Sequence, residues 1–135
     1  MPVRDTSHKG ALGEQLFANH FLENRIFISQ PIYDLWGADF VVEWEGGLHK
    51  VNVKTMSKQK TRGYFQVNLR HGTNGLSRYE PGQITYFGIV NLFYKRIWMV
   101  PLEAARNKGL CYFGPLENRQ KNTTSMFRWE NYRIK

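Results

Sequence analysis

The feature that most constrains the fold is a glycine pair, Gly46 and Gly47, between two segments that favour β-strands. Residues 38–44 and 48–56 are rich in β-branched and aromatic residues, so each predicts a strand. Two such strands joined by a short glycine turn form an antiparallel hairpin. We therefore expect a hairpin in the first half of the chain.

Side chains on a strand alternate between its two faces, which sorts the residues of this hairpin. Val51 and Val53 point one way, toward a core, while Asn52 and Lys54 share the opposite surface. Asp39 lies at the start of the first strand, and the turn brings it back toward the end of the second. An aspartate, an amide and a lysine are therefore expected to converge on one part of the sheet.

The rest of the chain predicts an α/β (α+β) fold, with one mixed central β-sheet and an N-terminal helix packed on it. Apolar residues recur at a helical period over residues 6–24, where Thr6 or Ser7 can cap the helix. The other elements that we expect are a strand over 26–30, a strand over 64–70, a hairpin over 84–92 and 96–100, and a short helix over 102–107. At 135 residues the chain is long enough for one domain.

The charge balance points to a polyanionic partner. Lys and Arg number 19 against 11 Asp and Glu, which gives a formal net charge of +8. Nucleic acid is the first candidate for such a basic domain, and an anionic membrane surface is the second. No apolar run approaches the roughly 20 residues that span a bilayer. The N-terminus has no apolar signal segment, so the expected location is cytoplasmic.

Hydrolysis of a phosphodiester needs the residue types that this hairpin gathers. A hard cation such as Mg²⁺ prefers oxygen ligands, and a carboxylate such as that of Asp39, together with an amide or a backbone carbonyl, can hold it. A bound metal polarises the phosphoryl oxygen and acidifies a bound water. A lysine such as Lys54 can orient that water or stabilise the developing charge. Glu14 can add a second carboxylate if its helix packs over the sheet. Each residue also has a plainer interpretation as a turn or solvated residue, and Asp34 is the main alternative to Asp39.

The pattern resembles the PD-(D/E)XK nuclease superfamily, and most closely the small cyanobacterial intron-encoded homing endonucleases. Glu14, Asp39, Asn52 and Lys54 match the order and spacing of that group's motif. The runs Lys-Gly-Ala-Leu-Gly-Glu at 9–14, Val-Asn-Val-Lys-Thr at 51–55 and Val-Pro-Leu-Glu at 100–103 are similar too. The resemblance covers about residues 7–105.

The resemblance implies a restriction-endonuclease-like core and a sequence-specific, metal-dependent endonuclease acting on double-stranded DNA. It also implies a bacterial or phage-encoded protein that holds Mg²⁺, or Mn²⁺ in its place, through Asp39, Glu14 and Asn52. Most of the superfamily carries Glu or Asp where Asn52 stands, whereas the intron-encoded group has a neutral amide, usually Gln. Asn is shorter and uncharged, so we expect weaker metal affinity unless Glu14 compensates.

Basic and polar residues after the hairpin are candidates for DNA contact. In the strand over 64–70, the polar side chains share the face opposite the apolar ones, which suits base reading or simple solvation. The candidates are Lys58, Lys60, Arg62, Gln66, Asn68, Arg70, His71 and Arg78. The basic, aromatic tail over 109–135 is expected to contact DNA or another subunit. Cutting both strands favours two active centres, so we expect a symmetric homo-oligomer, and the resemblance implies a dimer or a tetramer.

Two other functions fit the same residues. One is a structure-selective nuclease such as a Holliday-junction resolvase. The other is a non-catalytic nucleic-acid-binding module that kept the fold and lost an acid at Asn52.

Overall fold

The structure is a computed structural model that describes residues 5–33, 37–58, 65–71, 77–78, 82–105, 110–113 and 131–134. Its elements, in chain order, are α1 (Asp5–Glu23), β1 (Ile28–Ser29), β2 (Phe40–Trp44), β3 (Gly47–Thr55), β4 (Ser57–Lys58), β5 (Phe65–Asn68), β6 (Arg70–His71), β7 (Ser77–Arg78), β8 (Tyr86–Asn91), β9 (Arg96–Pro101), α2 (Leu102–Ala105) and β10 (Leu110–Phe113).

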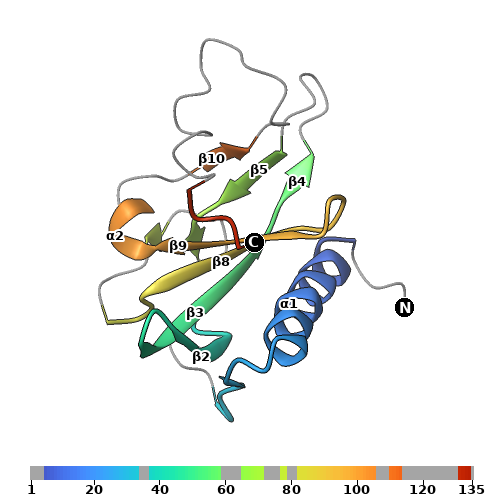
Figure 1. The fold of residues 1–135 in the computed structure, drawn as a ribbon. Helices are drawn as coiled ribbons and strands as arrows, with labels where there is room; N and C mark the ends of the chain where they lie inside the picture. Colours follow the sequence, from blue (N-terminus) through green and yellow to red (C-terminus); the bar gives the residue numbers. More distant parts are fainter. Residues whose placement is uncertain are drawn as a thin grey trace.

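A five-stranded mixed sheet in the order β1-β2-β3-β8-β9 forms the centre of the molecule (Figure 1). β3 and β8 run parallel, and the other neighbours are antiparallel. The expected hairpin is present, but its turn differs from the prediction. Gly47 pairs with Trp44, so the turn residues are Glu45 and Gly46. Both have positive φ, 49° and 81°, as the tight hairpin turn that matches strand twist requires.

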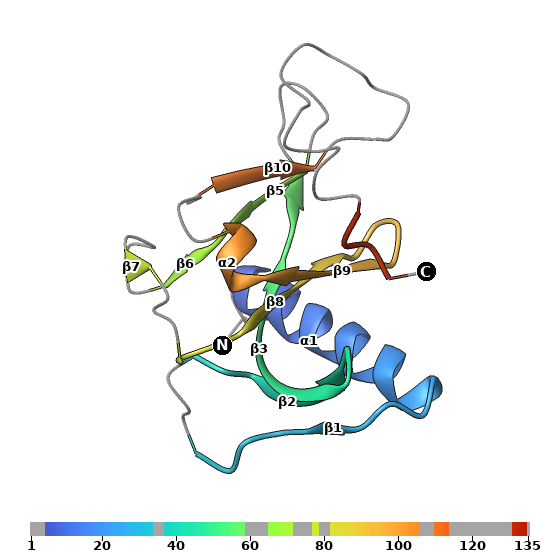
Figure 2. The ribbon, with the colours of Figure 1, turned by 60° about the vertical axis from the view of Figure 1, so that its left-hand side comes forward.

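α1 covers one face of this sheet, as the sequence predicts (Figures 1 and 2). The helix begins at Asp5, slightly before the expected cap. It ends in a motif in which Ile26 N–H donates to the Phe21 carbonyl and Arg25 N–H donates to the Leu22 carbonyl. Arg25 takes the left-handed conformation of this cap, with φ 57°. The chain is therefore turned sharply from α1 into β1.

Two glycines let α1 lie close against the parallel strands. The ring of Phe17 lies on Gly88 in β8, where an added Cβ would stand 2.5 Å from a ring carbon. Gly13 lies against Thr55 at the end of β3, and a Cβ there would collide with the Thr55 hydroxyl. Phe17 is fully buried, which anchors this contact. Glu14, next to Gly13, is thereby held near the carboxyl end of β3.

The opposite face of the sheet is also covered, which the sequence does not predict. β10, β5 and β4 form a separate three-stranded sheet, so the expected strand over 64–70 lies outside the central one. Phe65, Val67 and Leu69 pack there against Phe87 and Ile89 of β8. Asn52 points toward this covered side and is only 6% exposed, so the expected open polar surface is a buried one.

The end of the described chain returns to the free edge of β9. Tyr132 accepts a hydrogen bond from Met99 N–H, and Ile134 N–H donates to the Ile97 carbonyl. This pairing covers backbone groups that an edge strand would otherwise expose. Within the described ranges, no helix is both long and apolar enough to cross a membrane.

Candidate active site

The four residues that the sequence predicts to form the cleavage centre lie at the carboxyl end of β3: Glu14, Asp39, Asn52 and Lys54. Phe40 pairs with Val51, so Asp39, one residue earlier, lies opposite Asn52. Lys54 lies two residues further along the same strand. Glu14 reaches this place from α1, and its carboxyl group hydrogen-bonds Asp39. Three segments far apart in the sequence therefore meet at Asp39.

Asp39 is held by the backbone as much as by side chains. Its Oδ2 accepts a hydrogen bond from Val53 N–H at 2.7 Å. Its own N–H donates to the Val51 carbonyl at 2.8 Å. The β2–β3 ladder ends here, so the carboxylate takes the place of a backbone acceptor for Val53. Asp39 is fixed in the plane of the sheet with its position set by β3.

The side chain of Asn52 also donates a hydrogen bond to the Asp39 carboxylate. Its Nδ2 donates to the Gly37 carbonyl at 2.6 Å and to Asp39 Oδ2 at 3.3 Å. A carbonyl can only accept, so the Gly37 contact fixes which end of the amide is nitrogen. Oδ1 of Asn52 is buried and accepts no hydrogen bond from any residue of the described ranges. A buried carbonyl oxygen without a donor costs about 1–3 kcal/mol, which a cation ligated by this oxygen would offset.

The Glu14 carboxyl group has the most altered acidity in the site. Burial, the negative charge of Asp39 and the hydrogen bond with Asp39 raise the pKa of Glu14 from 4.5 to about 7. Each of these causes disfavours the ionised form of Glu14 relative to the protonated form. At pH 7 Glu14 is therefore about half protonated, and the pair holds close to one proton only below about pH 6.

Lys54 adds a positive charge to this pair. Burial lowers the pKa of Lys54 from its usual value, while the charge of Asp39 acts in the opposite direction. The side chain is half-buried, so its ammonium is partly withdrawn from water. A desolvated cation interacts more strongly with an anion placed beside it than a solvated one does.

The oxygens at this position are of the kind that hard divalent cations prefer. Glu14 and Asp39 supply two carboxylates, and Asn52 supplies the unpaired amide oxygen. A cation would counter both the burial and the repulsion by Asp39 that raise the pKa of Glu14. Over the described residues, no group of three or more His, Cys, Asp and Glu is placed to hold a metal. Beside these two acids, the Asn52 amide offers a further side-chain oxygen, although it is Nδ2 that faces Asp39.

The predicted DNA-contacting residues are only partly placed. In β5 the predicted alternation holds: Phe65, Val67 and Leu69 are buried, Gln66 is half-buried and Asn68 is exposed. Other predicted residues lie in the short strands β4, β6 and β7, with side chains outside the described part: Lys58, Arg70, His71 and Arg78. Lys60, Arg62 and the alternative carboxylate Asp34 also fall outside the described residues.

Sequence reasoning missed the backbone part of the site. The Val53 N–H and the Gly37 carbonyl orient Asp39 and Asn52, and every residue type carries such groups. Gly13 belongs to the Lys-Gly-Ala-Leu-Gly-Glu run at 9–14, but its role in letting α1 approach Thr55 depends on packing. The one available signal was the position of these glycines beside Glu14 and Asp39.

Comparison with known proteins bears on the fold and on the family. No match was found among curated protein sequences. The fold is similar to the solved structure of a bacterial homing endonuclease, I-Ssp6803I, with a TM-score of 0.79. The two chains are 22% identical, and the match covers 96% of this chain and 89% of the other. At that identity the similarity concerns the fold.

A family model described as PD-(D/E)XK endonuclease matches residues 4–135. The match includes the tail over 109–135, which lies beyond the motifs that carry the resemblance. Together with the central mixed sheet and its helix, it settles which protein family is present. The chain belongs to the PD-(D/E)XK endonuclease family.

Proposed function

We propose that this endonuclease hydrolyses phosphodiester bonds of double-stranded DNA with a divalent metal at Glu14, Asp39, Asn52 and Lys54. The observation that carries the proposal is the contact between the Glu14 carboxyl group of α1 and Asp39 of the hairpin. A helix that turned Glu14 elsewhere would leave a single carboxylate in the site.

Asp39, Glu14 and Asn52 are the proposed ligands of Mg²⁺, for which Mn²⁺ can substitute. A bound divalent cation supplies Lewis-acid polarisation of a phosphoryl oxygen and acidifies a nearby water molecule. The hydrogen bonds from Val53 N–H and Asn52 Nδ2 hold Asp39 in one orientation, so little reorganisation is needed when substrate binds.

Lys54 is proposed to stabilise the negative charge that develops on the phosphate, or to orient the attacking water. Its partly buried ammonium suits either role, because low solvent exposure strengthens its interaction with an anion. Glu14, with a pKa of about 7, must lose its proton before it can serve as a ligand. Activity should therefore rise as the pH approaches and passes neutrality.

Residues 1–135 are proposed to form one nuclease domain that recognises a specific sequence, as a homing endonuclease does. The fold similarity to a protein of that name supports this proposal. Gln66 and Asn68 remain candidates for base contacts. The candidates for phosphate contacts are Lys58, Lys60, Arg62, Arg70, His71 and Arg78. A dimer or tetramer is proposed because two centres are needed to cut both strands.

A non-catalytic DNA-binding module is the second candidate, and the neutral side chain of Asn52 is the observation that favours it. A site with two carboxylates and an amide binds a metal less tightly than one with three acids. If catalysis has been lost in this way, DNA binding would persist without cleavage.

Nicking of supercoiled plasmid in Mg²⁺ or Mn²⁺ tests the proposal. Asp39→Ala and Lys54→Ala should each lower the nicking rate by about 100-fold or more, since each removes a charge that acts at the reacting phosphate. Glu43→Ala, which removes an exposed acid from the same strand region as Asp39, is the matched control and should cut normally.

Three outcomes separate the alternatives. Equal DNA binding without cleavage by all four proteins would establish the binding module instead. Preferential cleavage of a synthetic four-way junction over linear duplex would indicate a structure-selective nuclease. Higher activity of Asn52→Gln would show that the short amide limits a working site.

A further inference from the structure

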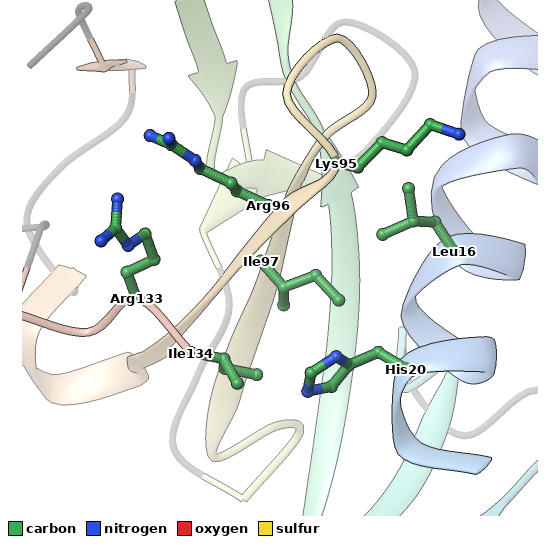
Figure 3. A pocket seen from close by; sticks show the side chains of 7 residues that line it. All are labelled: Leu16, His20, Lys95, Arg96, Ile97, Arg133 and Ile134. Carbon is green, nitrogen blue, oxygen red and sulfur yellow. The ribbon is translucent and has the colours of Figure 1, made fainter. Parts of the chain in front are cut away.

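A groove with a volume of about 480 Å³ runs along the flank of α1 between the helix, the start of β9 and the last described residues (Figure 3). Its floor is apolar and consists of Leu16, Ile97 and Ile134. Leu16 lies on a different side of α1 from Glu14, because residues two apart on a helix do not share a face. The groove is therefore separate from the carboxylate site.

The groove is positively charged. Lys95, Arg96 and Arg133 line it together with His20, and its described lining contains no acid. Figure 3 shows Lys95 reaching toward α1, while Arg96 and Arg133 lie on the other side of β9. A chain of phosphates that crosses the edge of β9 can therefore meet Lys95 on the α1 side and Arg96 and Arg133 on the other side.

The β8–β9 turn holds two of these cations in place. Asn91, which is 2% exposed, accepts a hydrogen bond from Tyr94 N–H at 2.9 Å. The Tyr94 ring packs on Phe65, and the Arg96 guanidinium lies 5.3 Å from the Tyr94 ring centroid. Lys95 has φ 54°, which the turn imposes. A turn fixed in this way orders its charged side chains at little further entropic cost on binding.

The turn also emerges beside the proposed cleavage centre. Lys54 and Thr55 pair in parallel with Ile89 and Val90, so β3 and β8 end at the same edge of the sheet. β9 is two strands from β3, roughly 10 Å at about 4.8 Å per strand spacing, and Arg96 lies two positions beyond the level of Lys54, roughly 7 Å at about 3.4 Å per residue. A DNA major groove is about 12 Å wide, so one duplex can reach both places.

We infer that this groove binds the phosphate backbone of the DNA duplex next to the cleavage centre, through Lys95, Arg96 and Arg133. The inference rests on the proposed DNA endonuclease function and adds a positioning surface to it. Contacts of this kind hold the duplex in register without reading its sequence. Their loss should weaken binding to any duplex equally.

Fluorescence anisotropy with a fluorescein-labelled duplex of mixed sequence, in EDTA to prevent cleavage, tests the groove. The affinity is measured over a range of NaCl concentrations. The affinity falls with salt, and each lost phosphate contact reduces the steepness of log affinity against log salt by about 0.9. Lys95→Gln and Arg96→Gln should each reduce that slope by about this amount, and Lys95→Arg should restore it.

Arg25→Gln is the matched control. Arg25 is also an exposed cation with positive φ, and it does not line the groove. Its replacement changes the net charge equally and should leave the salt slope unchanged. Thermal unfolding of all variants verifies that they fold alike.

The outcomes separate the groove from the function on which it rests. Equal slopes for Lys95→Gln, Arg96→Gln and Arg25→Gln, with wild-type protein still binding and cutting, would overturn the groove alone. A change in oligomeric state with an unaltered slope, seen by sedimentation, would make the groove a subunit contact and overturn the inference too. Absence of salt-dependent binding by wild-type protein would overturn both proposals.

Discussion

Two carboxyl groups in contact repel each other when both are ionised, and Glu14 and Asp39 are such a pair. The raised pKa of Glu14, about 7, means that the folded chain holds a proton that the unfolded chain releases near 4.5. This proton stabilises the metal-free fold fully below pH 4.5, and the stabilisation is lost as the pH rises through about 7. A bound cation would reverse the balance by favouring the ionised pair.

The first prediction concerns this pH dependence. In EDTA, the thermal midpoint of wild-type protein should fall, relative to that of Glu14→Gln, as the pH is raised from 4.5 through about 7. Thermal unfolding followed by circular dichroism measures it. Glu23→Gln, an exposed change near the end of the same helix, should follow wild type. Identical pH profiles for wild type and Glu14→Gln would contradict the pairing.

The second prediction concerns the amide of Asn52. Asn52→Asp adds a charge to the site and removes the donor to the Gly37 carbonyl, so the metal-free protein should lose about 1–3 kcal/mol of stability. The extra carboxylate should bind a cation more tightly, so Mn²⁺ should raise the thermal midpoint of Asn52→Asp more than that of wild type.

Asn19→Asp serves as the control for this change. Asn19 is exposed on α1, and its side-chain oxygen accepts a hydrogen bond from Gln15 that an Asp can retain. Its response to Mn²⁺ should equal that of wild type. An equal response by Asn52→Asp would argue against Asn52 as a ligand.

At the scale of elements, the site depends on how closely α1 approaches β3. Gly13 permits the contact with Thr55, and Thr55 Oγ1 lies 3.4 Å from the Lys9 carbonyl oxygen. A side chain at position 13 must push the helix away from the strand. Glu14, the next residue, would move with the helix and away from Asp39.

The third prediction compares two glycines of this helix. Gly13→Ala should destabilise the protein by about 1–3 kcal/mol through overpacking and should impair cleavage. Gly10→Ala, with nothing within 4 Å of its added Cβ, should stabilise it by about 0.5–1 kcal/mol. Urea unfolding and plasmid nicking measure the two effects. Equal stability of the two variants would show that α1 does not need the close contact.

At the scale of the whole molecule, the two ends of the described chain both pack on or pair with the central sheet. α1 covers one face and carries Glu14, while Tyr132 and Ile134 pair with the edge of β9. Arg133 joins the groove from the same terminal segment. The sheet, the cleavage centre and the proposed backbone groove therefore form one unit that includes the end of the chain.

The fourth prediction tests this closure. A chain that ends at residue 130 loses two backbone hydrogen bonds to β9, which contribute on the order of 2 kcal/mol together. It also exposes an edge strand, so it should self-associate more than the full chain. Urea unfolding and light scattering measure both changes, with removal of Lys135 alone as the control. Unchanged stability would mean that the terminal pairing is dispensable.

Much of the fold could be predicted from local pattern. The alternation of Val51, Asn52, Val53 and Lys54 gave the correct faces of β3, and the glycines marked the hairpin to within one residue. The burial of Asn52 could not be predicted, because it depends on β5 returning over the far face of the sheet. Such packing joins residues distant in sequence and leaves little trace in local periodicity.

The candidate site, like the fold, could be predicted from the sequence only in part. Side chains with distinctive chemistry, Asp39 and Lys54, could be found by type and spacing. The donors that orient Asp39 could not, since Val53 contributes only its N–H and Gly37 only its carbonyl, to Asn52. The pKa of Glu14 depends on a contact made by packing, so sequence predicted the residue but not its acidity.

The parallel pairing of β3 with β8 has a consequence for how the protein folds. Asp39, Asn52 and Lys54 belong to one hairpin, and hairpins form within about 1–10 μs. Glu14 arrives only when α1 docks on β3 and β8, a parallel pair whose residues are far apart in the chain. Contacts between distant residues form slowly, because a long loop must close first. In a newly synthesised chain, Glu14 should therefore join Asp39, Asn52 and Lys54 late in folding, after most of the sheet has formed.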